Sequence, residues 1–205
     1  MSEPVIIDLL RHGEVAAEGW AFRGSTDIPL SETGWQQMRK VGQRLASETF
    51  TQIATSPLIR CHHFSREFSQ HIDAPMCLLP EMREMDFGKW ENRGFEELEA
   101  ECGDMLRRFR ESPVGIHPPE GEAFDMFSIR VIESWKSWVS GASGEHRLLV
   151  AHGGVIRVLL SHLLNMPLPA IWRLHLPYAS WSRVSLLEGQ QPRVLFINRE
   201  ATCAD

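Results

Sequence analysis

The chain has 205 residues, enough for one domain with a sizeable core, and we expect residues 1–205 to form a single domain. Hydrophobic residues make up 43% and charged residues 23%, which is ordinary for a globular protein. The formal net charge of −6 gives no general attraction to nucleic acid or anionic membranes, so we expect neither as a partner.

Three further features predict a cytoplasmic protein without a membrane span. No apolar run reaches the ~18 residues of a membrane helix, because His152, Arg157 and His162 interrupt the longest candidate, residues 148–164. Residues 1–4 lack the basic start of a signal peptide. The cysteines show no paired spacing and are expected to be reduced thiols; they are Cys61, Cys77, Cys102 and Cys203.

The first predicted element is a strand at residues 5–10. This run is apolar and β-branched, which is typical of a strand buried on both faces. Residues 23–30 then form a predicted loop. Ser31 follows as the expected N-cap of a helix that runs to about residue 47.

A second strand and helix are predicted next. Residues 53–55 form a short apolar strand. Ser56 is expected to cap the following helix with Pro57 at its first position, where proline is favoured. Arg60 then lies in the first turn of that helix, close to the strand end.

The second half of the chain continues the alternation. Residues 95–110, 123–139 and 155–164 carry apolar spacing typical of helices, and residues 148–150 predict a buried strand. Residues 181–187 and 194–197 are predicted as two strands joined by a turn. This hairpin adds antiparallel strands to a sheet otherwise built from βα units, which predicts an α/β fold.

Two histidines lie directly after predicted strands. His12 follows Arg11 at the end of the first strand, and His152 follows the strand at residues 148–150. Open α/β sheets bind ligands beside the carboxyl ends of their strands, so we expect both side chains in one pocket. Imidazole is a nucleophile that can carry a phosphoryl group, and arginine can hold phosphate oxygens. The pattern therefore favours phosphoryl chemistry.

Four motifs in this order resemble the histidine phosphatase superfamily, which includes the cofactor-dependent phosphoglycerate mutases. They occupy residues 11–14 (Arg-His-Gly-Glu), 55–60, 80–91 and 151–154, so the resemblance covers essentially the whole chain. It implies a three-layer α/β/α sandwich with a mostly parallel sheet and an antiparallel edge. It also implies hydrolysis of small-molecule phosphate monoesters through a phosphohistidine, with no metal and no cofactor.

The resemblance assigns roles to individual residues. His12 is the expected nucleophile, and Arg11 and Arg60 are expected to hold the phosphate oxygens. His152 is expected to bind an equatorial oxygen and stabilise the transition state. Glu84 is the implied general acid and base. Only the resemblance distinguishes it from the neighbouring Glu81.

The phosphate site departs from the family pattern at one point. Many members carry an asparagine that contacts phosphate soon after the first histidine motif, and none is present here. Arg23, Ser25 or Thr26 are the candidate donors that replace it. The backbone N–H of Gly153, at the start of a predicted helix, is a further phosphate-binding candidate.

A metal site is the alternative interpretation of the Cys61-His62-His63 sequence with His71 and Cys77. The spacing matches no standard zinc pattern, and adjacent residues of a helix point in different directions. We therefore expect no metal.

The substrate is predicted from shorter likenesses. The stretch between Glu84 and His152 is short compared with phosphoglycerate mutases, which favours hydrolysis. Residues 83–93 and 119–124 resemble the α-ribazole phosphatases of cobalamin nucleotide-loop assembly. Their substrate needs a flat apolar wall, for which the candidates are Phe22, Trp90 and Phe124. A broad-specificity sugar-phosphate phosphatase, a phosphoglycerate mutase and a silent scaffold remain as alternatives, and the oligomeric state stays open, a homodimer included.

Overall fold

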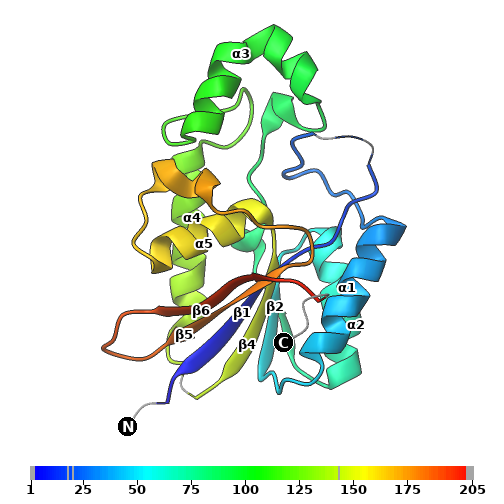
Figure 1. Cartoon of the computed structure of the whole chain (residues 1–205), viewed down its shortest axis with the longest axis vertical. Helices are drawn as coiled ribbons and strands as arrows, with labels where there is room; N and C mark the ends of the chain where they lie inside the picture. The colour runs from blue at the N-terminus through cyan, green and yellow to red at the C-terminus, as the bar shows by residue number, and fades with distance from the viewer. Residues whose placement is uncertain (1–2, 18, 20, 143, 202–205) are drawn as a thin grey trace.

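The computed structural model describes residues 3–17, 19, 21–142 and 144–201. Within this part of the chain, one six-stranded sheet has the order β3-β2-β4-β1-β5-β6 (Figure 1). Its strands are β1 (Val5–Arg11), β2 (Gln52–Thr55), β3 (Met76–Leu78), β4 (His146–Ala151), β5 (Trp181–Leu186) and β6 (Arg193–Arg199).

The pairing of the strands confirms the predicted mixed sheet. Strand β4 lies parallel to β1 on one side and to β2 on the other, and β2 pairs in parallel with β3. Strand β5 runs antiparallel to β1, and β6 runs antiparallel to β5. The C-terminal hairpin therefore forms the antiparallel edge.

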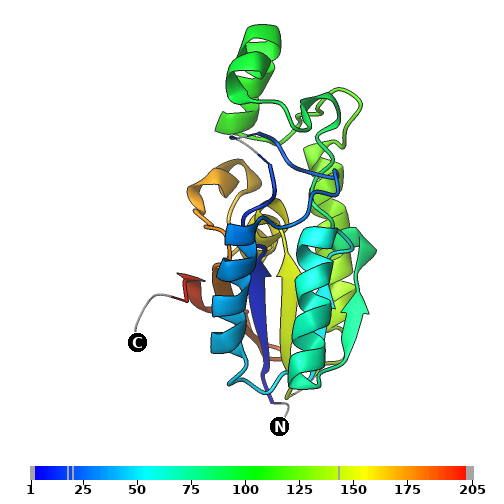
Figure 2. The same cartoon turned by 90° about the vertical axis from the view of Figure 1, so that its right-hand side faces the viewer.

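Helices cover both faces of the sheet. Helices α1 (Glu32–Leu45) and α2 (Ile59–Ile72) lie on one face, and α4 (Phe124–Val139) and α5 (Gly153–Leu163) lie on the other (Figure 2). Helix α3 (Phe95–Glu111) projects beyond the carboxyl ends of the central strands, at the top of Figure 1. Three short 3₁₀ helices complete the description: η1 (Pro80–Met82), η2 (Gly88–Trp90) and η3 (Leu168–Arg173).

Alternation along the central strands creates two separate apolar cores. Leu9 and Leu149 belong to the core under α4 and α5, whereas their neighbours Leu10 and Leu148 belong to the core under α1 and α2. All four side chains are fully buried. Because successive side chains of a strand point to opposite faces, one apolar run fills both layers. The predicted three-layer sandwich is thereby confirmed.

The start of α2 differs from the sequence prediction. The helix begins at Ile59, so Pro57 lies before it and Ser56 is not its N-cap. The Asp27 carboxylate accepts a hydrogen bond from the Ile59 N–H at 2.6 Å and satisfies the helix start from another loop. Arg60 still falls in the first turn, as predicted.

The other predicted helices are confirmed with small shifts in their ends. Ser31 caps α1, and its side chain accepts a hydrogen bond from the Gly34 N–H. Helix α5 begins at Gly153, two residues before the predicted start. No helix in the described part of the chain is long and apolar enough to cross a membrane.

Candidate active site

The two motif histidines meet at the carboxyl edge of the sheet. Strands β1 and β4 are adjacent and parallel, with Arg11 opposite Ala151, so the next residue of each strand reaches the same place. The His12 N–H donates to the Ala151 carbonyl at 3.1 Å. The imidazole centroids of His12 and His152 are 5.2 Å apart. The two rings therefore lie side by side, but only His12 lines the open pocket described below, and His152 is fully buried.

His12 is held in a state suited to nucleophilic attack. Its Nδ1 lies 2.7 Å from the Gly13 carbonyl, which can only accept, so Nδ1 carries the proton and Nε2 keeps its lone pair. Burial, with help from the charges of Arg60 and Arg11, lowers the pKa of His12 well below its usual value. The imidazole is therefore neutral at neutral pH.

His152 is oriented by two polar partners. Its Nδ1 accepts a hydrogen bond from Arg60 Nε at 3.2 Å, which places the ring proton on Nε2. Nε2 lies 2.7 Å from the hydroxyl oxygen of Ser56, the residue that directly follows β2. Burial, and then the charge of Arg60, lowers the pKa of His152 well below its usual value. Its side chain is thus fixed and neutral.

Arg60 is fully buried and clamps a loop as well as His152. Its two terminal amino groups donate to the carbonyls of Thr26, at 2.8 Å, and Gly24, at 2.6 Å. The guanidinium has no carboxylate partner within ion-pair distance among the described residues. A buried cation held only by carbonyls and a neutral imidazole favours an anion beside it.

The structure does not bring the side chains of Ser25 and Thr26 into the phosphate pocket. Both hydroxyls are directed to the Glu91 carboxylate, with Thr26 Oγ1 at 2.6 Å. Glu91 also accepts the backbone N–H groups of Gly24, Ser25 and Thr26. These residues build the loop that holds Arg60. The sequence could not show this, because Glu91 lies far along the chain.

Arg11 offers a free donor to the pocket. It donates from Nη1 to the Leu176 carbonyl, and its guanidinium lies 4.1 Å from the centre of the Tyr178 ring. Its Nε is buried and makes no hydrogen bond within the described part of the chain. An oxyanion bound here would satisfy that donor.

Glu84 and Glu81 have contrasting environments. The Glu84 carboxylate is buried and accepts hydrogen bonds from the N–H groups of Gly154, at 2.9 Å, and Met85, at 3.2 Å. Gly154 is in the first turn of α5, whose N-terminus favours a negative charge. Glu81 pairs with Arg83, and 51% of its side chain is exposed. Only Glu84 reaches the site.

Part of this set opens onto a polar pocket of about 520 Å³, whereas His152 and Arg60 are fully buried and are not in its wall. Its wall includes Arg11, His12, Glu84 and Tyr178. Arg23 also lines the pocket, from the loop after β1. Of the three donors expected to replace the missing asparagine, only Arg23 is in the wall. Two of its terminal N–H bonds reach backbone carbonyls of its own loop, at Gly19 and Ala21.

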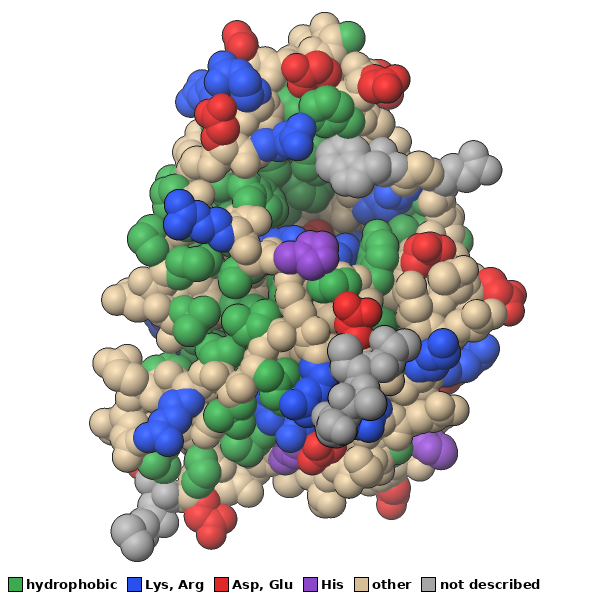
Figure 3. All heavy atoms as spheres, in the orientation of Figure 1, with side chains coloured by type: hydrophobic (Ala, Val, Ile, Leu, Met, Phe, Trp, Pro, Cys, Tyr) green, Lys and Arg blue, Asp and Glu red, His purple; other side chains and the backbone are tan. Residues whose placement is uncertain are grey.

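A second, largely aromatic cavity of about 300 Å³ adjoins the polar pocket and shares Arg11, Arg23 and Glu84 with it. Figure 3 shows this face hollowed between the α3 region and the body of the molecule, with hydrophobic side chains gathered in the hollow. The aromatic residues of its wall are Phe22, Phe87, Phe109, Phe124, Phe127 and Trp172.

The predicted apolar wall is partly in place. Phe22 and Phe124 line the cavity, whereas Trp90 is almost fully buried behind it. The centres of the Trp90 and Phe22 rings are 5.4 Å apart, so Trp90 supports the wall from outside the cavity. The sequence pattern could not separate wall from support, because both positions are aromatic.

Three residues near the site were missed in the sequence. Tyr178 is the only tyrosine in the chain and stacks on Arg11. Arg157 lines the aromatic cavity, four residues after Gly153 and thus on the same face of α5. Ser56, expected as a helix cap, holds His152 instead. Helical spacing from the second histidine motif was a usable signal for Arg157.

The cysteine–histidine sequence does not form a metal cluster within the described part of the chain. Cys61 is buried, with its Sγ 3.6 Å from His152 Nε2, and burial raises the pKa of its thiol. His63 is partly exposed and packs on Trp35, with ring centres 5.1 Å apart. The two side chains therefore lie on different faces of α2.

An α/β sheet that carries two neutral histidines, two arginines and a carboxylate at its carboxyl edge is typical of enzymes of phosphoryl transfer. Residues 7–200 match the histidine phosphatase superfamily (branch 1), and the chain belongs to this family. It is therefore an enzyme that acts on phosphate monoesters.

Several known proteins are similar along nearly their whole length. The adenosylcobalamin/alpha-ribazole phosphatase of Salmonella typhimurium is 30% identical over 88% of this chain and 90% of its own. The probable phosphoglycerate mutase GpmB of Photorhabdus laumondii is 34% identical over 86% and 82%. The crystal structure of a putative alpha-ribazole-5'-P phosphatase from Escherichia coli superimposes with a TM-score of 0.86 at 27% identity, covering 98% of this chain and 99% of the other.

Proposed function

We propose that this enzyme hydrolyses phosphate monoesters through a phosphohistidine on His12. Nε2 of His12 attacks phosphorus, and the bond from phosphorus to the leaving oxygen breaks. Glu84, in its protonated form, donates a proton to that oxygen, so a neutral alcohol leaves and Glu84 becomes the carboxylate that the N-terminus of α5 stabilises. The Glu84 carboxylate then takes a proton from water, the resulting hydroxide attacks phosphorus, and the phosphorus–nitrogen bond breaks to release inorganic phosphate.

The positive charge for this reaction comes from arginines and helix α5. Arg11 and Arg60 bind the phosphate oxygens, which is supported by the fully buried position of Arg60 beside His152 and by the half-buried Arg11, whose Nε has no hydrogen-bond partner among the described residues. The His152 Nε2–H, which contacts the Ser56 hydroxyl at 2.7 Å in the structure, donates instead to an equatorial oxygen when phosphate is bound and charge develops there. The Gly153 N–H, in the first turn of α5, adds a backbone donor.

The substrate we propose is α-ribazole 5′-phosphate, a phosphate ester that carries a flat heteroaromatic ring. The cavity that adjoins the phosphate pocket carries this proposal, because six aromatic side chains in its wall offer stacking surface for a flat ring beside the phosphate. Arg157, on the same wall, can donate to oxygens of the sugar between phosphate and ring. The identity to phosphatases of that name supports the choice.

A comparison of related substrates tests the specificity. We expect kcat/KM for α-ribazole 5′-phosphate to exceed that for ribose 5-phosphate, which lacks the ring, and that for 3-phosphoglycerate. Trp172→Ala removes one aromatic side chain from the cavity wall. It should lower kcat/KM for α-ribazole 5′-phosphate by about tenfold and leave kcat/KM for ribose 5-phosphate nearly unchanged. Trp35→Ala, on the other face of the molecule, is the matched control. Equal values for all three substrates in the wild type would refute the assignment.

Trapping of the intermediate tests the chemistry. Quenching during turnover of a ³²P-labelled substrate should leave an acid-labile, base-stable label on the protein. His12→Ala should abolish that label, because it removes the attacking nitrogen. Label that persists in this variant would exclude His12 as the nucleophile.

A further inference from the structure

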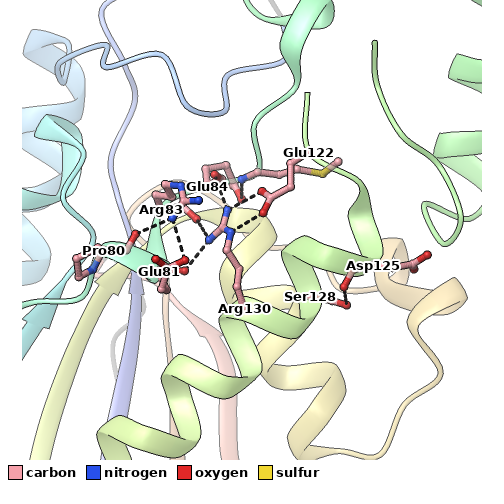
Figure 4. A network of polar contacts seen from close by, with 9 residues as sticks. Pro80, Glu81, Arg83, Glu84, Glu122, Asp125, Ser128 and Arg130 are labelled. Atoms are coloured by element: carbon pink, nitrogen blue, oxygen red, sulfur yellow. Dashed lines mark hydrogen bonds and ion pairs between the residues drawn. The ribbon is translucent and has the colours of Figure 1, made fainter. Parts of the chain in front are cut away.

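Arg130, on α4 and outside both pockets, is the centre of the polar network in Figure 4. It forms a paired contact with Glu122, Nε to Oε1 at 2.6 Å and Nη2 to Oε2 at 2.8 Å. Both side chains are largely buried, 12% and 17% exposed. Such a shielded pair is held far more firmly than a surface ion pair.

The remaining donors of Arg130 reach the backbone next to Glu84. Nη1 donates to the carbonyls of Glu81, at 2.6 Å, and Arg83, at 3.0 Å. Nη2 donates to the carbonyl of Glu84 itself, at 3.1 Å. These bonds, with the Glu122 pair, use all the N–H donors that a guanidinium has. Between η1 and η2, residues 83–87 belong to no helix or strand, so side-chain bonds help to hold the segment that carries Glu84.

Glu84 is therefore fixed at both ends. Its carbonyl is bound by Arg130, and its carboxylate is bound by the Gly154 N–H at the start of α5. The Glu122 N–H donates to the Asp86 carbonyl at 2.8 Å. The pair of Arg130 and Glu122, called the clamp below, therefore also holds the chain just after Glu84. A proton donor contributes fully only when it is within hydrogen-bond reach of the leaving oxygen.

We propose that Arg130, anchored by Glu122, is a positioning residue that holds Glu84 in place for proton transfer to the leaving group. The inference rests on the proposed role of Glu84. Lysine cannot replace Arg130, because an ammonium lacks the planar array that spans one carboxylate and three carbonyls at once. The clamp acts on the acid step and not on the capture of the phosphate.

Leaving-group dependence separates this role from general structural support. kcat/KM reports phosphorylation of His12, so it should vary little with leaving-group pKa while the acid works. Glu84→Gln should lower kcat/KM for alkyl phosphates by about 10² to 10⁴-fold and for p-nitrophenyl phosphate much less, since nitrophenolate leaves without a proton. Glu81→Gln, an exposed acid three residues before, should resemble the wild type.

The clamp variants should reproduce this pattern in weaker form. Arg130→Lys is expected to lower kcat/KM for alkyl phosphates by about 10² and to leave p-nitrophenyl phosphate within about threefold. Glu122→Gln, which keeps a hydrogen-bonding group, is the milder variant if Arg130→Lys folds poorly. Arg83→Gln is the matched control: its side chain makes an exposed pair with Glu81 and should leave the dependence unchanged.

The combined variant shows whether Arg130 acts through Glu84. In a Glu84→Gln background, Arg130→Lys should cost little more, because the step that the clamp serves is already lost. A uniform loss over all leaving groups, or full additivity in the double variant, would overturn the clamp. A flat leaving-group dependence in Glu84→Gln itself would instead refute the acid role in the proposed function.

Discussion

The charged side chain of Arg157 is largely removed from solvent, which lowers the stability of the folded chain. Its Nε donates to the Leu174 carbonyl at 2.9 Å, and its guanidinium lies 5.6 Å from the centre of the Trp172 ring. Burial, and then repulsion from Arg11, lowers the pKa of Arg157 to about 10. Because the pKa is lower in the folded chain than in the unfolded chain, folding disfavours the charged form that exists at neutral pH. Such a residue is expected where a ligand needs a donor.

Removal of this charge should therefore separate stability from activity. Arg157→Met keeps much of the side-chain volume, and we expect the free energy of unfolding to rise by about 1–3 kcal/mol, measured by urea denaturation. At the same time, KM for sugar-linked phosphates should increase about tenfold, because one donor is lost from the cavity.

An exposed arginine provides the comparison for that variant. Arg107→Met, on α3, should change the free energy of unfolding by less than about 0.5 kcal/mol. If Arg157→Met were instead less stable than the wild type, Arg157 would be a structural residue of the η3 region.

At the scale of elements, the first turn of α5 joins the two halves of the mechanism. His152 directly precedes the helix, and Gly153 and Gly154 form its first turn. A Cβ at Gly153 would lie 2.9 Å from Arg157 Nη1 and 3.3 Å from Arg11 Nε. A Cβ at Gly154 would overlap the Glu84 carboxylate. The glycines let charged groups approach the helix backbone closely.

Gly154→Ala should consequently impair the acid without weakening the helix. Alanine is a better helix former than glycine by about 1 kcal/mol, which offsets much of the cost of displacing the Glu84 carboxylate, so the free energy of unfolding should change by less than about 1–2 kcal/mol. The displaced carboxylate should lower kcat/KM for an alkyl phosphate by about tenfold or more. Gly103→Ala, within α3, has room beside the flexible Glu99 side chain and should leave kcat/KM unchanged. Unaltered turnover by Gly154→Ala would show that the Glu84 carboxylate can move away from this contact without loss of proton transfer.

The length and burial of each element decided what the sequence could reveal: the short but buried β2 was predicted, whereas the short and partly exposed β3 was not. Strand β1 and helix α4 were predictable, because long apolar patterns define them, whereas only the buried residues 148–150 of β4 were predicted. Strand β3 has three residues, none fully buried, and is too short to show a period. The start of α2 was misplaced because Asp27, a residue from another loop, caps it.

Some residues of the candidate site could be predicted from local sequence patterns, and others could not. Positions at strand ends, such as His12 and His152, followed from the pattern and the family motifs together. The partners of Thr26 and Trp90 depended on contacts between distant segments, which no local pattern encodes.

At the scale of the whole molecule, two apolar cores stabilise the sheet, whereas polar and charged side chains are buried at its carboxyl edge, which costs free energy of folding. Fully buried leucines on both faces of β1 and β4 supply the apolar stabilisation. His12, His152 and Arg60 are buried at the edge of the same strands. Since the site groups are built into the sheet ends, their protonation is linked to global stability.

The pH dependence of stability should show this linkage. The pKa values of His12 and His152 lie well below 6.5 in the folded chain, because burial opposes their charged forms. As the pH falls below about 6.5, the unfolded chain binds protons that these two rings do not accept when folded. Stability is therefore fully present above that pH and decreases on acidification, by up to about 1.4 kcal/mol per pH unit for each ring.

Urea denaturation at about pH 7.5, 6.5 and 5.5 measures this slope before most carboxylates titrate. His152→Asn removes one of the two rings and should reduce the slope between the lower two values by up to about 1.4 kcal/mol per pH unit. His63→Asn is the control, because that ring is 41% exposed and should leave the slope as it is. If His152→Asn kept the slope of the wild type, the His152 ring could not be buried and neutral in the folded enzyme, and its Nδ1 could not accept the hydrogen bond from Arg60 that orients it.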